Sequence, residues 1–157
     1  MAASKYKMEQ IRYSELHSED FEQLLKMSQK LWTDFDEEEL KNLLKEMTQL
    51  EKNRILMAKR ADGENVGFSI FSIRTDYVEG ADKSPTGYLE GIYIEPPYRK
   101  NGIAKEFLRI GEMWCKEKGC TQIGSDTWLT NKASREFHKK IGFWEEEEIV
   151  HFLKNIK

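Results

Sequence analysis

Residues 89–104 read LEGIYIEPPYRKNGIA, a stretch that begins like a strand and ends like the start of a helix. Residues 89–94 are largely apolar, and strand periodicity places residues 89, 91 and 93 on one face and residues 90, 92 and 94 on the other. Pro96 and Pro97 lack backbone donors and exclude helix, so the strand ends before them. Gly102 lets the backbone approach a ligand closely, and Ala104 falls in a first helical turn whose unpaired amides favour phosphate. The stretch therefore predicts a pyrophosphate-binding turn between a strand and a helix.

Two common phosphate-binding motifs do not fit this turn. A dinucleotide fingerprint needs three glycines, and a nucleotide-triphosphate loop needs Gly-Lys followed by Ser or Thr. Residues 99–104 contain one glycine and neither pattern, although Arg99, Lys100 and Lys105 add positive charge nearby. A short glycine turn also arises by chance, so taken alone the stretch leaves an ordinary turn open.

The composition limits the class of protein. A chain of 157 residues with 39% apolar content predicts a single domain over residues 1–157. The formal net charge of -3 provides no basic field for nucleic acid. The apolar runs are too short for a membrane span and residues 1–10 are too polar for a signal peptide, so we expect a cytoplasmic protein without a membrane partner. Cys115, Cys120 and three scattered histidines lack metal-ligand spacing, so we expect no metal and buried, reduced thiols.

Helix and strand patterns extend in both directions from this stretch. Apolar periodicity predicts a helix capped by Ser18 and a second helix opened by the acidic run 34–39, whose buried stripe is Leu40, Leu43, Leu44 and Met47. The remaining expected elements are strands over 7–13, 54–61, 66–74 and 121–127, helices from 103 to about 118 and from the Asn131 cap to 140, and extended structure over 143–153. The order β-α-α-β-β-β-α-β-α-β indicates a mixed sheet with helices on its faces, in the α/β or α+β class.

Two of these segments resemble a known superfamily. The order Arg-x-x-Gly-x-Ala after a strand, in Arg99–Ala104, resembles the acetyl-coenzyme A loop of the GNAT (GCN5-related N-acetyltransferase) superfamily, and Phe137–Phe143 resembles its helix followed by Gly-Phe. The resemblance implies the GNAT acyl-CoA N-acyltransferase fold, with a mixed central sheet of six to seven strands flanked by about four helices. It also implies acetyl-CoA as co-substrate.

Further stretches resemble one branch, the aminoglycoside 6'-N-acetyltransferases, over nearly the whole chain. The most specific is Asp76–Gly80, read as Asp-Tyr-Val-x-Gly, followed by Ser84-Pro85 and by Leu89–Ile92. Leu31-Trp32, Ser125–Thr127, Asn131, His138, Gly142-Phe143 and Glu145–Glu147 match as well. The resemblance implies acetylation of the 6'-amine of kanamycin-like or tobramycin-like antibiotics, which are cationic partners. Members of this family are often dimers, so a homodimer is implied too.

The motif matches imply two sets of site residues. Those of the aminoglycoside site are Trp32, Tyr77, Glu90, Asp126 and Glu147. Those of the cofactor site are Ile92, Tyr93, Ile94, Lys100, Asn101, Gly102, Ile103, Ala104, Lys105 and Asn131. A polycation needs carboxylates, and Asp34, Asp36 and Glu79 add to the acidic residues near the motifs. The plainer interpretations are a core position for Trp32, a helix start for residues 34–39 and a solvated face for residues 145–148.

The expected chemistry requires a proton acceptor. An alkylammonium with a pKa of about 10.4 is only about 0.1% free base at neutral pH. Glu90 lies on the strand that leads to the cofactor turn, so we expect it to act as the general base, directly or through water, or to anchor the ammonium. A backbone amide near Ile92–Ile94 is expected to stabilise the oxyanion. Much of the superfamily has a tyrosine acid where this chain has His138, which either protonates the leaving thiolate or only packs in its helix.

Two other functions use the same cofactor turn. One is an acetyltransferase for another primary amine, such as a polyamine, a metabolite or a protein N-terminus. The other is a module that senses acetyl-CoA without turnover, which the position of Glu90 beside the cofactor strand disfavours.

Overall fold

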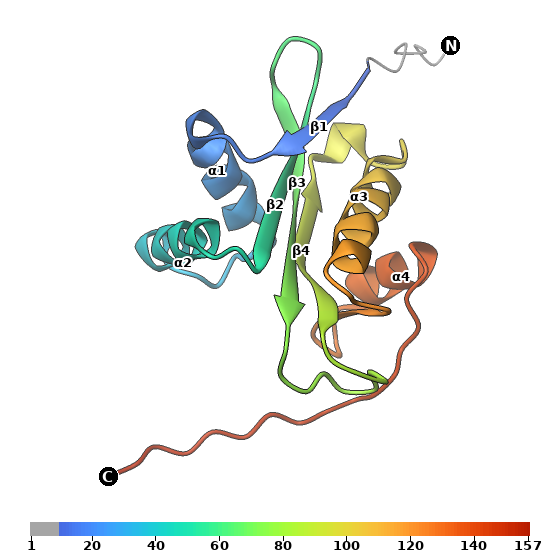
Figure 1. Cartoon of the computed structure of the whole chain (residues 1–157). Coiled ribbons are helices and arrows are strands. Elements are labelled where there is room, and N and C mark those ends of the chain that lie inside the picture. Colours follow the sequence, from blue (N-terminus) through green and yellow to red (C-terminus); the bar gives the residue numbers. More distant parts are fainter. Residues whose placement is uncertain (1–9) are drawn as a thin grey trace.

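A computed structural model describes residues 10–157 as a mixed sheet between two pairs of helices (Figure 1). The strands run in the order β1-β2-β3-β4-β5 across the sheet, with β1 to β4 antiparallel to their neighbours and β5 parallel to β4. The strands are β1 (Arg12–Glu15), β2 (Asn53–Lys59), β3 (Asn65–Arg74), β4 (Thr86–Ile94) and β5 (Ile123–Ser125). The fold class is confirmed, although the described residues form five strands rather than six to seven.

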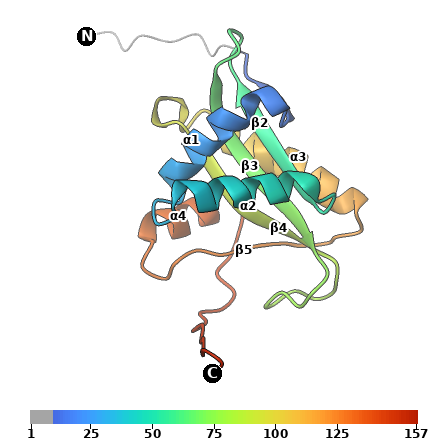
Figure 2. The ribbon, with the colours of Figure 1, turned by 90° about the vertical axis from the view of Figure 1, so that its left-hand side faces the viewer.

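The helices divide between the two faces of the sheet. They are α1 (Phe21–Leu31), α2 (Glu37–Gln49), α3 (Ile103–Glu117) and α4 (Lys132–Lys140). Helices α1 and α2 cover one face and α3 lies on the other with α4 near it, as Figures 1 and 2 show from two sides. One apolar cluster joins α1 and α2 to Phe68 and Ile70 of β3, and a second joins α3 to Phe71 and Leu89. Helices α1, α2 and α3 are therefore held by burial of their apolar stripes against the sheet. None of the helices formed by residues 10–157 is both long and apolar enough to cross a membrane.

Helix α1 begins later than the sequence predicted, whereas α2 begins in the acidic run as predicted. Ser18 lies within a short 3-10 turn, Ser18–Asp20, and α1 starts only after Asp20, so Ser18 does not cap the α-helix. Asp36 caps α2, where its carboxylate accepts hydrogen bonds from the amides of Glu38 and Glu39 at 3.1 and 3.3 Å. In the expected stripe of α2, Leu40 and Leu44 are buried, whereas Leu43 is 37% exposed, so its assignment to the core is wrong.

A β-bulge in β4 overturns the expected alternation. Ile70 of β3 pairs with Gly91 and the next residue, Phe71, pairs with Leu89, so Glu90 is the extra residue between them. As a result Leu89, Ile92 and Ile94 all belong to the cluster on the α3 face, while Tyr93 packs into the cluster of α1 and α2. Glu90 and Gly91 both lie on the α1 face, because Glu90 bonds to Ser72 and Gly91 faces Trp32. The prediction that residues 89, 91 and 93 share a face is therefore wrong.

The sheet has fewer strand residues than expected near both ends of the chain. Strand β1 covers residues 12–15, whereas the expected strand was 7–13, and residues 7–9 lie outside the described part of the chain. Strand β5 is also shorter than the expected 121–127. Residues 143–157 run extended away from the body and join no strand of the described sheet (Figure 1). The final extended segment is thus present but unpaired.

Candidate active site

The open edge of β4 is the first part of the site. Strand β5 pairs with β4 only from Gly87 to Leu89, opposite Ile123 to Ser125. Beyond Leu89, no described strand pairs with Glu90–Ile94 on that side. Backbone groups of a strand are strong donors and acceptors that need partners. This edge is therefore available to a ligand with amide groups, and it includes Ile92, Tyr93 and Ile94 of the expected cofactor set.

The turn after β4 forms the second part. Pro96–Tyr98 make one 3-10 turn, after which Lys100 and Gly102 both have left-handed backbone, with φ of 64° and 82°. Gly102 stands at the N-cap of α3, where no side chain caps the helix and where an added Cβ would meet nothing within 4 Å. The first-turn amides of residues 103–105 are thus uncapped by side chains and lie beside open space, an arrangement that suits a phosphate.

Arg99 has a different role from the cation that the sequence suggested. Its Nε donates to the carbonyl oxygen of Ile94 at 2.8 Å, and its guanidinium lies 5.4 Å from the centre of the Tyr93 ring. Arg99 therefore ties the turn back to the end of β4. The structure brings residues 92–94 and 100–105 of the expected cofactor set to one continuous surface.

A charged cluster around Glu90 forms the third part. The Glu90 carboxylate accepts from Ser72 Oγ at 2.5 Å and from Arg74, with Nε–Oε1 at 3.1 Å and Nη2 at 2.9 Å from both oxygens. The Arg74 guanidinium also lies 3.3 Å from the centre of the Tyr88 ring, and the Tyr88 hydroxyl donates to Asp126. Burial, together with the hydrogen bond to Asp126, raises the pKa of Tyr88, so its hydroxyl keeps its proton.

Trp32 forms a wall of this cluster rather than a purely core contact. An added Cβ on Gly91 would lie 2.6 Å from Cζ2 of Trp32, so the indole packs directly on the bare backbone of β4 beside Glu90. Its ring centre is 6.1 Å from that of the buried Phe68. Because one side of Trp32 is packed and the ring is only half-buried, it is fixed next to the bulge and still offers a surface there.

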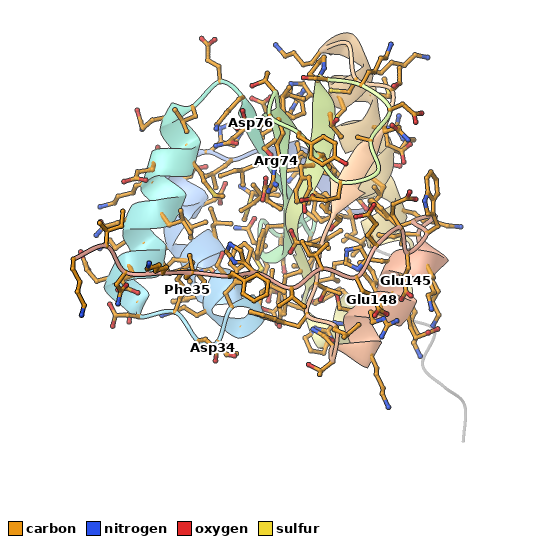
Figure 3. The ribbon with its side chains drawn as sticks, turned by 90° about the horizontal axis from the view of Figure 1, so that it is seen from below. Asp34, Phe35, Arg74, Asp76, Glu145 and Glu148 are labelled. Atoms are coloured by element: carbon orange, nitrogen blue, oxygen red, sulfur yellow. The ribbon has the colours of Figure 1, made fainter. Side chains whose placement is uncertain are left out.

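The other expected acceptor residues lie on exposed segments at the same end of the sheet. Tyr77 is 78% exposed on the β3–β4 loop, and Glu147 is exposed on the C-terminal segment. The two segments touch, because a Cβ on Gly80 would collide with Glu146. Figure 3, seen from below, shows Arg74 and Asp76 near one another at the end of β3, with Asp34 and Glu145 on other segments away from them.

His138 has both ring nitrogens engaged. Nδ1 lies 2.7 Å from the Ser134 carbonyl, to which it donates, and Nε2 lies 2.8 Å from Ser125 Oγ. Ser125 is also 3.1 Å from the carbonyl oxygen of Leu89, at the last pair between β4 and β5. His138 therefore reaches the point where the two strands separate only through Ser125.

Asn131 has a local structural partner. Its Oδ1 accepts from the amide of Ser134 at 3.0 Å and caps α4, as the sequence predicted. This hydrogen bond engages Oδ1 of Asn131, so a contact from the cofactor to this side chain would use its Nδ2 donor. Among residues 10–157 no group of three or more His, Cys, Asp or Glu side chains is placed to hold a metal ion.

The geometry agrees with the comparisons with known proteins. Residues 15–143 match the model of the acetyltransferase (GNAT) family. The chain belongs to this family. A relative from Acinetobacter haemolyticus, named aminoglycoside N(6')-acetyltransferase type 1, is 38% identical over 134 residues, which cover 84% of this chain and 90% of that protein. A protein of the same name from Stenotrophomonas maltophilia is 34% identical and covers 78% of each chain.

Solved structures of acetyltransferases share the whole fold. The aminoglycoside antibiotic 6'-N-acetyltransferase AAC(6')-Ih from Acinetobacter baumannii superimposes with a TM-score of 0.88 at 30% identity, covering 94% of this chain and 100% of that one. AAC(6')-Iy, solved in complex with the bisubstrate analog CoA-S-monomethyl-acetylneamine, gives 0.85 at 31% identity, with 94% and 99% covered. The expected membership of the GNAT family is confirmed.

Sequence reasoning missed three residues of this candidate site: Ser72, Arg74 and Tyr88. Arg74 lies two residues before the recognised motif Asp76–Gly80, but no role was assigned to it. The available signal was its spacing from Ser72 near the end of β3. Residues two apart in a strand lie on the same face, so Ser72 and Arg74 could have been placed together. That this face meets Glu90 depends on the bulge, which the sequence did not reveal.

Proposed function

We propose that this acetyltransferase moves an acetyl group from acetyl-CoA to the 6'-amino group of aminoglycoside antibiotics by direct attack of the free amine. The observation that carries the proposal is the arrangement along β4. An uncapped helix N-terminus follows one end of the strand, an open backbone edge runs along residues 90–94, and Glu90 stands at the middle of the strand, where this edge begins. The names of the relatives and of the solved neighbours support the same acceptor class.

The cofactor fits the backbone-built part of the site. The pyrophosphate is placed at the amides of residues 103–105, and the amide groups of the pantetheine arm pair with Glu90–Ile94 in the manner of an added strand. The thioester then lies near Glu90. A backbone amide of Ile92–Ile94 faces the carbonyl oxygen and stabilises the oxyanion that develops on it.

The acceptor fits the part built from side chains. Glu90 and Asp126 provide carboxylates, and Trp32 and Tyr77 provide apolar ring surface for a sugar face. In this scheme Glu90 binds the 6'-ammonium and receives its proton, directly or through a water. The amine then attacks the thioester carbon, the carbon–sulfur bond breaks, and the thiolate leaves.

Protonation of the departing thiolate is assigned to the Ser125–His138 pair. Ser125 lies at the last β4–β5 pair, and the imidazole behind it is 2.8 Å away, so a proton passes from His138 through the hydroxyl. An unassisted thiolate is the alternative, in which case His138 serves only to hold Ser125 and α4.

A thiol-release assay with a panel of acceptors tests the proposed function. We expect kanamycin and tobramycin to accelerate release of coenzyme A, and spermidine and a basic peptide to do so far less. Acceleration by spermidine or the peptide alone would replace the antibiotic with another amine. Binding of acetyl-CoA without acceleration by any acceptor would point to a sensing module.

The C-terminal segment supports a homodimer as part of this proposal. Trp144, Ile149, Val150, Phe152, Leu153 and Ile156 are between 66% and 97% exposed. An extended apolar segment with unpaired backbone adds readily to a strand edge of another copy. Removal of residues 149–157 should convert a dimer to a monomer in light scattering; an unchanged mass would place the interface elsewhere. A cytoplasmic location is also proposed, since Cys115 and Cys120 are both free thiols.

A further inference from the structure

Arg74 covers the carboxylate to which the acceptor amine is assigned. Its guanidinium makes three contacts of 2.9–3.1 Å with Glu90 and stacks at 3.3 Å on the Tyr88 ring. The side chain of Arg74 is 40% exposed and that of Glu90 only 20% exposed. The cation therefore lies on the solvent side of the pair.

The groups around this guanidinium form a general cation site. A carboxylate held by Ser72 from behind, an aromatic face and a second carboxylate on Asp126 are the groups that bind ammonium and guanidinium ions from solution. In the free protein a residue of the chain itself fills this site. Arg74 donates to both oxygens of Glu90 and Ser72 to one of them, so an external ammonium has to compete with Arg74 for this carboxylate.

We propose that Arg74 is a resident cation that the substrate ammonium displaces from Glu90. The inference rests on the proposed function, because it concerns the same acceptor site. On binding, the 6'-ammonium takes the place of the guanidinium on Glu90, and no covalent bond changes in this step. Asp76, two residues further along and beside Arg74 in Figure 3, offers the released guanidinium another carboxylate.

The exchange has the same cost for every acceptor. A monoamine and a polycation must both displace the bidentate guanidinium before an ammonium takes its place on Glu90. Arg74 thus acts as a competitor of any acceptor amine at this carboxylate.

The test compares Arg74→Gln with the wild type for kanamycin and for 6-amino-6-deoxyglucose, a single-charge acceptor with the same kind of amine. Gln keeps part of the stem and removes the charge. We expect the KM to fall about tenfold for both acceptors, because each ammonium no longer competes with a resident cation for Glu90. Methylguanidinium should then inhibit the variant competitively with the amine and leave the wild type unaffected, because it refills the vacated place.

Arg109→Gln is the matched control, since Arg109 makes an equally close pair with Glu106 on the surface of α3, at 2.7–3.1 Å. It should change neither KM. A higher KM for both amines in Arg74→Gln, or restoration of activity by methylguanidinium, would show that Arg74 positions Glu90 and would overturn the proposal. Calorimetric titration of methylguanidinium into both proteins decides the matter without turnover: heat with the variant alone supports the exchange, and equal heats contradict it. Failure of the wild type to acetylate kanamycin would count against the proposed function alone.

Discussion

The two ends of β4 bind their proposed ligands by different means. At the Ile94 end, the site consists of backbone: an unpaired strand edge, two left-handed residues and the amides of a helix that no side chain caps. At the Tyr88 end, it consists of side chains, with Glu90 held by Ser72 and Arg74, and Tyr88 bonded to Asp126. Backbone sites depend on conformation, whereas side-chain sites depend on residue identity. Substitutions should therefore separate cofactor binding from acceptor chemistry.

The largest effect is expected at the side-chain end, from Glu90→Gln. The amide cannot accept the ammonium proton, so kcat/KM for the acceptor should fall by roughly two to four orders of magnitude. Binding of coenzyme A, measured by calorimetry, should stay the same because it depends on backbone. Glu64→Gln in the β2–β3 turn, where Glu64 pairs with Arg60 at 3.0 Å, serves as the control. An unchanged rate for Glu90→Gln would remove this carboxylate from the mechanism.

The next largest effect is expected for Ser125→Ala and His138→Ala. These variants test whether the two residues protonate the thiolate where β4 and β5 separate. If the two residues pass one proton, each variant should lower kcat by about 100-fold, and the double variant should be no worse than either. Full retention of kcat in His138→Ala would mean that the thiolate leaves unassisted.

A smaller effect, confined to the cofactor, is expected for Gly102→Ala at the backbone end. Its φ of 82° costs a residue with a Cβ about 1–2 kcal/mol, and the new methyl group would point into the space assigned to the pyrophosphate. The affinity for coenzyme A should fall about tenfold while the kcat at saturation changes little.

Gly63→Ala provides a closely matched control for this change. Gly63 has a φ of 88° and equally empty surroundings, but it lies in the β2–β3 turn. Both variants should lose similar thermal stability, and only Gly102→Ala should lose affinity. Equal affinities for coenzyme A in the two variants would contradict the pyrophosphate site at α3.

The smallest effect concerns Cys115, which packs behind β4 against Gly87. Burial raises the pKa of the Cys115 thiol to about 12, so it should not react with a thiol reagent at pH 8 until the protein unfolds. Because the folded pKa is the higher one, the contribution to stability is complete below the unfolded pKa of about 9 and is lost as the pH rises toward 12. Rapid labelling of native Cys115 would indicate that the sheet opens at this place.

Local patterns predicted the elements and the cofactor turn well. The prolines after Ile94, the glycine before Ile103 and the caps Asp36 and Asn131 act within a few residues of where they stand, so their effect follows from sequence. The assignment of Leu43 to the core was wrong for a different reason. Helical periodicity predicts which face of a helix is buried, but how wide the buried part of that face is depends on the segments that pack on it.

The acceptor end was predicted only in part. Trp32, Glu90 and Asp126 were expected there from motif resemblance, but Ser72, Arg74 and Tyr88 were not expected as their neighbours. A bulge is a relation between two strands, since the extra residue exists only relative to the register of β3. No periodicity in residues 86–94 alone indicates that Glu90 and Gly91 share a face.

By itself the sequence determined the family, the order of helices and strands and the backbone turn at Gly102, because these depend on residues close together in the chain or on motifs. Only the tertiary structure decided that Glu90 meets a cation of its own chain, that His138 contacts Ser125, and that residues 143–157 join no strand of the described sheet. These outcomes depend on register and packing between distant segments, which local propensities do not specify.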